Sequence, residues 1–163
     1  MKLKERIMFS QKEEAWCGVA CIAEALHRVQ GKIVPQDELA KYLGTTKKDG
    51  TDHQQMFRGT LGLGLNAELL LGTSLKILQE HLNNNEVVIV NWMSGFDINN
   101  DGHYSILEEI SDKFITLNDP SFVGSIRTMH RKDFEEFWFD IEHGIRVNKM
   151  ALVIKSYPSN VLR

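Results

Sequence analysis

The sequence predicts an α+β fold, and three observations lead to that fold class. The first half of the 163-residue chain repeats its apolar residues with a period near 3.6, which is typical of amphipathic helices. The second half contains short apolar runs between turn residues, which are typical of antiparallel strands. No repeat or linker divides the chain, which has three prolines and no tract rich in Ser and Gly. We therefore expect a single domain over residues 1–163.

Five helices are predicted from start and stop signals. The first carries its apolar side chains on one face and stops before Gly31. The second begins with Pro35, which suits the first helical position, and the third begins at a cap from Thr51 or Asp52. Aromatic and aliphatic residues at helical spacing indicate the last helix: Phe134, Phe137, Trp138 and Ile141. The predicted helices span residues 17–30, 35–44, 50–62, 73–82 and 131–142.

Five strands are predicted from runs rich in β-branched and aromatic residues: 66–71, 86–92, 103–110, 114–120 and 150–156. The third and fourth flank a turn at Ser111 and Asp112, so they are expected to form a hairpin. Helices dominate the first half and strands the second, so we expect an N-terminal helical part packed on an antiparallel sheet.

Composition and charge exclude several classes of protein. The net charge is -3 at pH 7 and no run of Lys or Arg forms a basic patch, so nucleic acid is not an expected partner. Apolar runs such as residues 87–90 are far too short to span a membrane. The N-terminal segment has basic residues but lacks the apolar stretch of a signal peptide. We therefore expect a cytoplasmic protein without a membrane span.

The two cysteines, Cys17 and Cys21, are expected to be free thiols. They lie one helical turn apart, where Cβ atoms are separated by about 5–6 Å. A disulfide needs about 3.8 Å between these atoms, so pairing would distort the helix. A zinc site is not expected either, because no second cysteine pair exists. Cys21 is interpreted as a core residue.

Cys17 is a candidate nucleophile because it opens a predicted helix. A thiol at a helix N-terminus meets the positive end of the helix dipole and unpaired backbone N–H groups, which favour the reactive thiolate. Cysteine catalysis also needs a nearby base, usually His, and a third group that orients the base. An oxyanion donor is needed as well. The backbone N–H of Cys17 and the side-chain amide of Gln11 are the candidates for that role.

His103 and Asp119 are the candidate base and orienting group. His103 lies where a glycine-bearing loop enters a strand, and Asp119 lies at the end of the next strand, before Pro120. A hairpin turn centred on Ser111 would set the two side chains directly opposite each other, with Cβ atoms about 4.5–5.5 Å apart. A turn centred between Ser111 and Asp112 would instead place the side chains of His103 and Asp119 on opposite faces of the sheet. The contact therefore requires an odd hairpin loop or a bulge.

These residues resemble a known family. Gln11, the Cys17-Gly18 pair, "DGHY" and "NDPS" are similar to the bacteriocin-processing peptidase family, and the resemblance covers about residues 9–142. It is closest to the stand-alone members, because no transporter segment follows and Trp16 stands where exporter-fused members usually carry an acidic residue. The resemblance implies a papain-like fold and peptide cleavage through a thioester acyl-enzyme. Exporter-fused members cut leader peptides after Gly-Gly.

The sequence therefore predicts a cysteine peptidase whose partner is a peptide or protein substrate and which needs no cofactor or metal. Cys17, His103, Asp119 and Gln11 are its expected catalytic residues. Two alternatives use the same residues or the same cleft. One is a transpeptidase or deamidase with the same triad, and the other is a catalytically silent module that binds peptides.

The segment of residues 97–108 also matches the spacing of an EF-hand loop, with Glu108 as the last ligand. The context does not fit, because an EF-hand loop joins two helices and strands are predicted on both sides here. A weaker calcium loop from Asp97, Asn99 and Asp101 is a second interpretation. A polar turn that directs His103 is the preferred one.

The remaining histidines lack partners at metal spacing and are interpreted as surface or satisfied residues: His27, His53, His81, His130 and His143.

Overall fold

The computed structural model of the chain describes residues 9–95, 102–121 and 126–156. The helices are α1 (Cys17–Gln30), α2 (Gln36–Leu43), α3 (His53–Gly62), α4 (Leu75–Asn83) and α5 (Arg131–Phe137). The strands are β1 (Asn66–Leu70), β2 (Val87–Trp92), β3 (His103–Ile110), β4 (Phe114–Asn118), β5 (Ile126–His130), β6 (Phe139–Glu142), β7 (Ile145–Asn148) and β8 (Ala151–Lys155).

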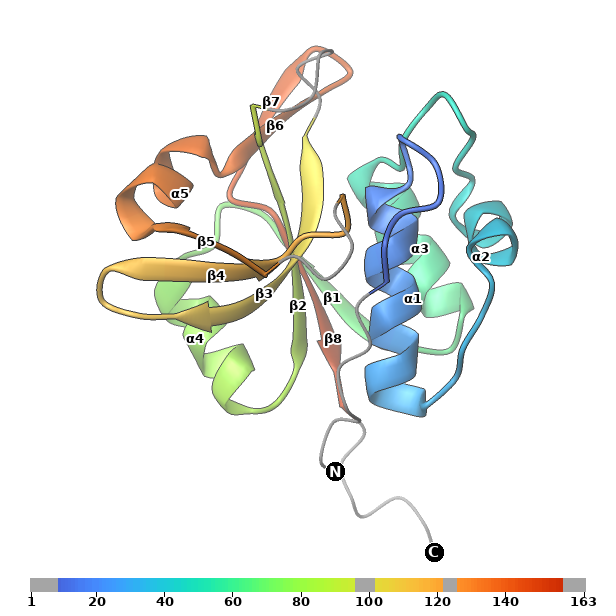
Figure 1. Cartoon of the computed structure of the whole chain (residues 1–163), viewed down its shortest axis with the longest axis horizontal. Helices are drawn as coiled ribbons and strands as arrows, with labels where there is room; N and C mark the ends of the chain where they lie inside the picture. Colours follow the sequence, from blue (N-terminus) through green and yellow to red (C-terminus); the bar gives the residue numbers. More distant parts are fainter. Residues whose placement is uncertain (1–8, 96–101, 122–125, 157–163) are drawn as a thin grey trace, which may run out of the picture.

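The centre of the molecule is a six-stranded antiparallel sheet with the strand order β1-β8-β2-β3-β4-β5. Helices α1, α2 and α3 lie on one side of this sheet, and α4 and α5 lie on the other (Figure 1). A separate hairpin of β6 and β7 lies at the end of the molecule toward which the N-terminus of α1 points (Figure 1). The predicted α+β class is therefore confirmed, and so is the packing of the N-terminal helices on an antiparallel sheet.

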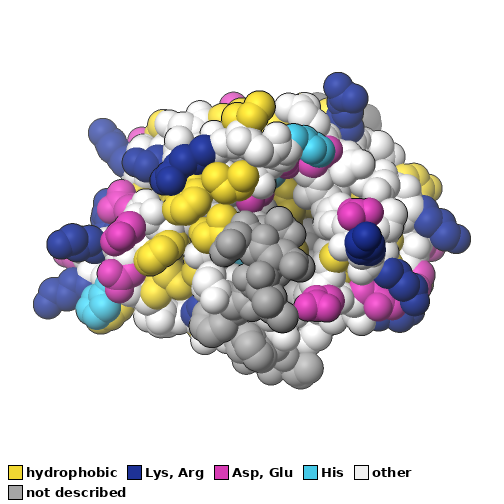
Figure 2. Space-filling view, turned by 90° about the horizontal axis from the view of Figure 1, so that it is seen from above, with side chains coloured by type: hydrophobic (Ala, Val, Ile, Leu, Met, Phe, Trp, Pro, Cys, Tyr) yellow, Lys and Arg dark blue, Asp and Glu magenta, His cyan; other side chains and the backbone are white. Residues whose placement is uncertain are grey.

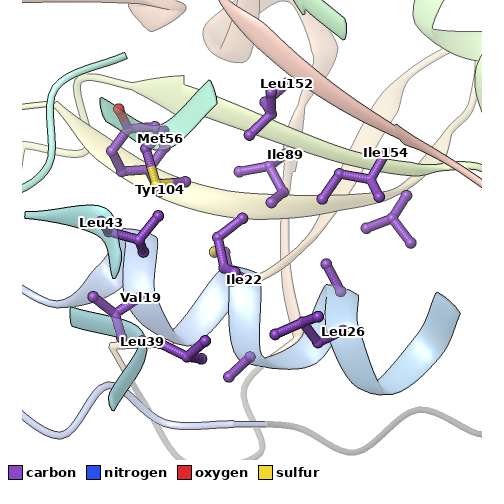
Figure 3. Close-up of a cluster of buried hydrophobic side chains, with 14 of the residues drawn as sticks. Val19, Ile22, Leu26, Leu39, Leu43, Met56, Ile89, Tyr104, Leu152 and Ile154 are labelled. Atoms are coloured by element: carbon purple, nitrogen blue, oxygen red, sulfur yellow. The ribbon is translucent and has the colours of Figure 1, made fainter. Parts of the chain in front are cut away.

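Helix α1 is the central element of the larger core. Ile22 and Leu26 are fully buried and face the sheet, where Ile22 points toward Ile89 of β2 (Figure 3). Leu39 and Leu43 of α2 belong to the same buried cluster and pack near Val19 at the start of α1 (Figure 3). Burying side chains of this size contributes about 1.5–3 kcal/mol each, so the packing fixes α1 against the sheet and with it the position of Cys17.

A buried polar network joins α1 to the sheet. Arg28 of α1 forms ion pairs with Glu24, one turn earlier, and with Glu108 of β3. The second oxygen of Glu24 accepts a hydrogen bond of 2.7 Å from the amide of Asn118 in β4. Burial raises the pKa of Glu24, and Arg28 opposes that shift. The network therefore ties the helix that carries Cys17 to β3 and β4, the two strands that position the candidate base and its orienting group.

Replacing Arg28 by alanine is expected to lower the free energy of unfolding by roughly 3–5 kcal/mol, because it removes the buried cation shared by Glu24 and Glu108. Urea unfolding monitored by circular dichroism measures this change. The control is Arg131→Ala, which removes an exposed pair with Glu135 and should cost under about 1 kcal/mol. Equal effects of the two substitutions would contradict the prediction.

The predicted helix over residues 131–142 is wrong in its second half. Helix α5 ends at Phe137, and the next residues form β6, which pairs with β7. His143 and Gly144 both have positive φ, at 51° and 78°, which makes the tight turn of a hairpin. The alternating segment 138–142 fits that strand as well as a helix, and the turn decides between them. Phe137 is consequently 46% exposed, whereas Phe134 and Trp138 are buried as predicted.

The EF-hand interpretation is excluded by the strand that comes directly after the loop. Strand β3 begins at His103, and Glu108 lies within it and pairs with Arg28. Asp97, Asn99 and Asp101 lie outside the described residues. Within the described ranges, no helix is long and apolar enough to cross a membrane.

Candidate active site

Cys17 is the first residue of α1, and its thiol is half-buried and free. The preceding Trp16 has a buried indole that donates a hydrogen bond of 2.9 Å to the carbonyl of Thr46. No described side chain caps this helix, and its first turn contains no acidic residue. The backbone N–H groups of the first turn of α1 therefore form no hydrogen bond with a capping side chain, and they lie next to Cys17.

His103 and Asp119 are in direct contact. His103 Nε2 and Asp119 Oδ1 are 2.7 Å apart, and the carboxyl group of Asp119 is only 1% exposed. Cys17 lies close enough to His103 to raise the pKa of the imidazole, and the two residues line one cleft. Because Nε2 faces the carboxylate, the other ring nitrogen, Nδ1, is the one available to the sulfur. The structure thus brings the predicted nucleophile, base and orienting group together.

Two further groups hold the carboxylate of Asp119 in place. The backbone N–H of Ser121 donates to Oδ1 at 3.0 Å, and Arg127 Nε lies 3.1 Å from Oδ2. The guanidinium of Arg127 also lies over the ring of Trp92, whose edge contacts the His103 ring. Sequence reasoning missed Arg127, because it belongs to β5, a strand that was not predicted.

The electrostatics of the pair favour its charged form. Burial alone lowers the pKa of His103, but the hydrogen bond with Asp119 and the neighbouring Cys17 outweigh burial and raise that pKa to about 10. Burial raises the pKa of Asp119, whereas the hydrogen bond from His103, its positive charge and the Ser121 N–H lower it to about 2. An imidazolium held between a carboxylate and a thiol is the form that can later donate a proton.

The free energy of unfolding is expected to fall as the pH rises from about 6.5 to about 10. The folded state keeps the His103 proton over this range and the unfolded state, with an ordinary pKa near 6.5, does not. The contribution of Asp119 is instead present above its ordinary pKa and is lost as the pH falls through about 2. Urea unfolding at several pH values measures the slope. The same slope in His103→Ala would contradict this assignment.

A β-bulge sets the alignment of His103 and Asp119. The hairpin loop has an even length, since Ile110 pairs with Ile115. The register then shifts by one residue at Glu108, so that Ile106 pairs with Asn118. The required bulge is therefore present and keeps the two side chains on one face. His103 and Asp119 are diagonal neighbours on this face and not directly opposite each other. The pairing of β3 with β4 therefore differs by two residues from the one expected for a turn centred on Ser111.

Gln11 lies beside this site, but its side-chain amide donates to two carbonyl groups of its own loop. Its backbone N–H donates to the carbonyl of Pro120 at 2.8 Å, which places it next to Asp119. Its side-chain NH₂ group donates to the carbonyls of Glu13 and Glu14, in its own loop. The oxyanion role of Gln11 stays a prediction, and it requires the side chain to rotate. Catalytic hydrogen bonds often align only when substrate is bound.

A cleft of about 720 Å³ opens in front of Cys17 and His103. One wall is the loop of residues 44–52, and the other is β6 with the turn after it. Asp140 and Glu142 line the cleft, although the sequence predicts a helix at these positions. Figure 2 views the molecule from this end. Charged side chains of both signs are scattered over the face, and they do not form the basic surface that binds nucleic acid.

The histidine interpretation is wrong at two positions. His53 is 3% exposed, and its Nε2 has no hydrogen-bond partner in the described part of the chain. Nδ1 of His27 is in the same situation. The neighbours of His53 come from β6, nearly 90 residues later in the chain, so local spacing gave no signal. Cys21 is buried in the core, as predicted.

A cysteine at a helix N-terminus, facing a His–Asp pair on an antiparallel sheet, characterises the papain-like fold of the C39 peptidases. The chain belongs to the Peptidase_C39 like family, whose model matches residues 4–144. No curated protein sequence matches the chain.

Solved structures of peptidase domains share the fold. A putative C39-like peptidase from Bacillus anthracis has a TM-score of 0.70 at 17% identity, over 93% of this chain and 98% of that one. The peptidase domain of ComA, a bifunctional ABC transporter of Streptococcus, has 0.68 at 17% identity, over 95% and 98%. A double glycine motif protease from an AMS/PCAT transporter, in complex with its leader peptide, has 0.64 at 16% identity, over 95% of each chain.

Proposed function

We propose that this chain is a cysteine peptidase that hydrolyses peptide bonds through a thioester acyl-enzyme. The observation that carries the proposal is the 2.7 Å contact between His103 and Asp119, with Cys17 beside His103 in the lining of the same cleft. Family membership supports the same chemistry. We propose that residues 1–163 act as one domain. A cytoplasmic location is part of the proposal, since that compartment keeps thiols reduced.

The proposed reaction begins with attack of the Cys17 thiolate on the carbonyl carbon of the substrate. The imidazolium of His103 donates its proton to the leaving amine as the C–N bond breaks, which leaves a thioester on the sulfur. His103, now neutral, removes a proton from water, and the resulting hydroxide attacks the thioester. The sulfur leaves as a thiolate, and the acid product is released. Asp119 keeps the imidazole in the orientation that both steps require.

The negative oxygen of each tetrahedral intermediate needs a donor in the proposed mechanism. The backbone N–H of Cys17 is one, and the Gln11 amide becomes the second if it exchanges its bonds to Glu13 and Glu14 for the oxyanion. The exchange would break only a weak restraint on the carbonyl end of this half-buried side chain, since Gln11 Oε1 accepts a long hydrogen bond, of 3.4 Å, from the Ser121 hydroxyl.

Replacing Gln11 by alanine is expected to lower kcat by roughly 10²-fold with little effect on KM, because the donor acts mainly in the transition state. Steady-state kinetics on a cleaved peptide provide the measurement. Gln79→Ala, which removes an exposed amide of α4, serves as the control and should keep wild-type rates. An unchanged kcat in Gln11→Ala would exclude it as an oxyanion donor.

The proposed substrate class is a peptide whose cleaved bond lies in the cleft beside Cys17. A peptide with a double glycine is the first one to try, because a structural neighbour was solved with its leader peptide bound. The experiment incubates the purified chain with such a peptide and with a mixed peptide library, and follows new termini by mass spectrometry. Cleavage by the wild type but not by Cys17→Ala supports the proposal. Products that carry an added amine would instead indicate a transpeptidase.

One observation favours a second candidate, a catalytically silent module that binds peptides. The amide of Gln11 is already engaged by two carbonyl groups of its own loop. Alkylation of Cys17 by iodoacetamide separates the two candidates. Fast alkylation at neutral pH that is lost in His103→Ala supports the enzyme. Slow alkylation in both proteins, together with peptide binding, supports the silent module.

A further inference from the structure

A second cluster of polar side chains lies in the cleft wall, apart from the proposed catalytic residues. His53 is the first residue of α3, and Asp140 and Glu142 are on β6. One ligand atom from each of the three lies within 4.8 Å of the other two. The proposed peptidase mechanism uses none of these residues, so their arrangement needs another explanation.

The hydrogen bonds of His53 determine which ring nitrogen carries a proton. The hydroxyl of Tyr104 donates its only hydrogen to the carbonyl of Thr51, at 2.9 Å. The same hydroxyl lies 2.8 Å from His53 Nδ1, so it accepts a hydrogen bond there and Nδ1 carries the proton. Nε2 of the neutral ring then offers a lone pair. That lone pair is buried and has no donor among the described residues.

The carboxylate of Asp140 is oriented toward this lone pair. Its Oδ1 accepts hydrogen bonds from the backbone N–H groups of Gly102, at 2.8 Å, and Ile141, at 2.6 Å. Its Oδ2 lies 3.8 Å from His53 Nε2, which is too long for a hydrogen bond. Two ligands that each lie about 2.0–2.2 Å from one Zn²⁺ ion would be separated by roughly 3–4 Å.

A second buried polar atom lies next to the same carboxylate. Asn91 is 1% exposed, and its Oδ1 has no hydrogen-bond partner in the residues described. A Cβ atom on Gly102 would lie 2.0 Å from this oxygen and 2.4 Å from Asp140 Cγ. Glycine at position 102 therefore allows Asn91 and Asp140 to approach each other. Two unsatisfied buried atoms near the carboxylate of Asp140 cost free energy unless a bound group satisfies them.

We propose that His53 Nε2 and Asp140 Oδ2 bind a divalent transition-metal ion of the Zn²⁺ type. Asn91 Oδ1 and Glu142, whose Oε1 accepts the His53 backbone N–H at 2.7 Å and lies 3.3 Å from Nδ1, are the adjacent oxygen donors. An imidazole nitrogen with two carboxylates suits Zn²⁺ better than Mg²⁺, which prefers oxygen ligands alone. The two carboxylates balance the charge of the ion. The proton on Nδ1, held by Tyr104, is the outer hydrogen bond that metal-binding histidines usually make.

The position of this site links it to the cleft. The ring of Tyr104 lies between the two centres, because its hydroxyl contacts His53 and its Cδ2 would lie 3.2 Å from a Cβ on Gly18. Asp140 also holds Gly102, the residue directly before His103. A bound ion would therefore stiffen the entry to β3 and narrow the cleft on the side of β6. The proposal does not depend on peptidase activity.

The test is a zinc titration of the full chain carrying Cys17→Ala, so that the thiol cannot bind the metal. Calorimetry and thermal unfolding are the two readouts. We expect one Zn²⁺ per chain, a micromolar or lower dissociation constant, and a raised melting temperature. Asp140→Asn keeps an Oδ1 acceptor for Gly102 and Ile141 but removes the ligand oxygen, so affinity should fall about 10–100-fold. Asp133→Asn, at an exposed position of α5, should change affinity less than twofold.

Three results would overturn the proposal. The first is a titration in which zinc produces neither heat nor a rise in melting temperature. That result is expected if a buried water molecule, and not a metal ion, satisfies these polar atoms. The second is zinc binding that Asp140→Asn leaves unchanged. The third is an equal response to Mg²⁺. Should Asp140→Asn fail to fold, Glu142→Gln at the half-buried ligand provides the same comparison. None of these readouts measures turnover, so a failure here leaves the peptidase proposal standing.

Discussion

Cys17→Ala is expected to reduce peptide hydrolysis by roughly 10⁴-fold or more while leaving the fold intact. The thiolate is the only group of the protein that bonds to the substrate carbon in the proposed reaction, so no neighbour can replace it. The side chain is small and half-buried at the first position of α1, and its loss removes little packing. Initial rates on a cleaved peptide and circular dichroism measure the two effects.

The control for this substitution is Cys21→Ala, one turn further along α1. Cys21 is buried in the core, and burial raises the pKa of its thiol, so it is not a competing nucleophile. Its replacement should lower stability modestly and preserve turnover. A folded Cys17→Ala protein that still hydrolyses peptide would exclude the proposed mechanism.

His103→Ala is expected to lower kcat by a similar factor, roughly 10⁴-fold. This change removes both the partner of the Cys17 thiolate and the donor of the proton that the leaving amine needs. Because the residues act as one unit, the double variant with Cys17→Ala should be no slower than either single variant. Steady-state and single-turnover rates for the three proteins measure the coupling.

His143→Ala is the matched control for His103→Ala. His143 lines the same cleft, but its side chain is 81% exposed. Its removal should alter kcat less than about threefold. Additive losses in the double variant, or a large loss in His143→Ala, would place the essential histidine elsewhere.

The candidate triad could be predicted because its signals are local. The apolar periodicity of residues 17–30 predicts the same bounds for α1 that the structure has, and that places Cys17 at the helix start. His103 and Asp119 belong to adjacent strands of one hairpin, so sequence counting limited their geometry to a few registers. The register is set by the bulge at Glu108, whose side chain pairs with Arg28 of α1. Counting residues along the hairpin cannot predict this bulge, because the pairing partner lies in a distant helix.

The remaining parts of the site depend on contacts between distant segments. The last predicted helix extends to residue 142, because the aromatic spacing in this segment fits a helix as well as a strand. Pairing of β6 with β7 settles the choice and moves Asp140 and Glu142 into the cleft. His53 gains its neighbours by the same pairing. No local pattern links residues that are almost 90 positions apart.

The extra residue in β3 has a consequence for insertions and deletions. A three-residue loop on a strand without the bulge would give the same pairing of Ile106 with Asn118 as the four-residue loop with it. The two arrangements use the same number of residues between Ile106 and Asn118, so a change in loop length alone does not move His103 relative to Asp119. Deleting Glu108 itself would straighten β3 and keep Ile106 opposite Asn118, but it would remove the partner of Arg28. The bulge residue and the buried cation of α1 should therefore be lost together among homologous chains, as correlated changes at separate positions.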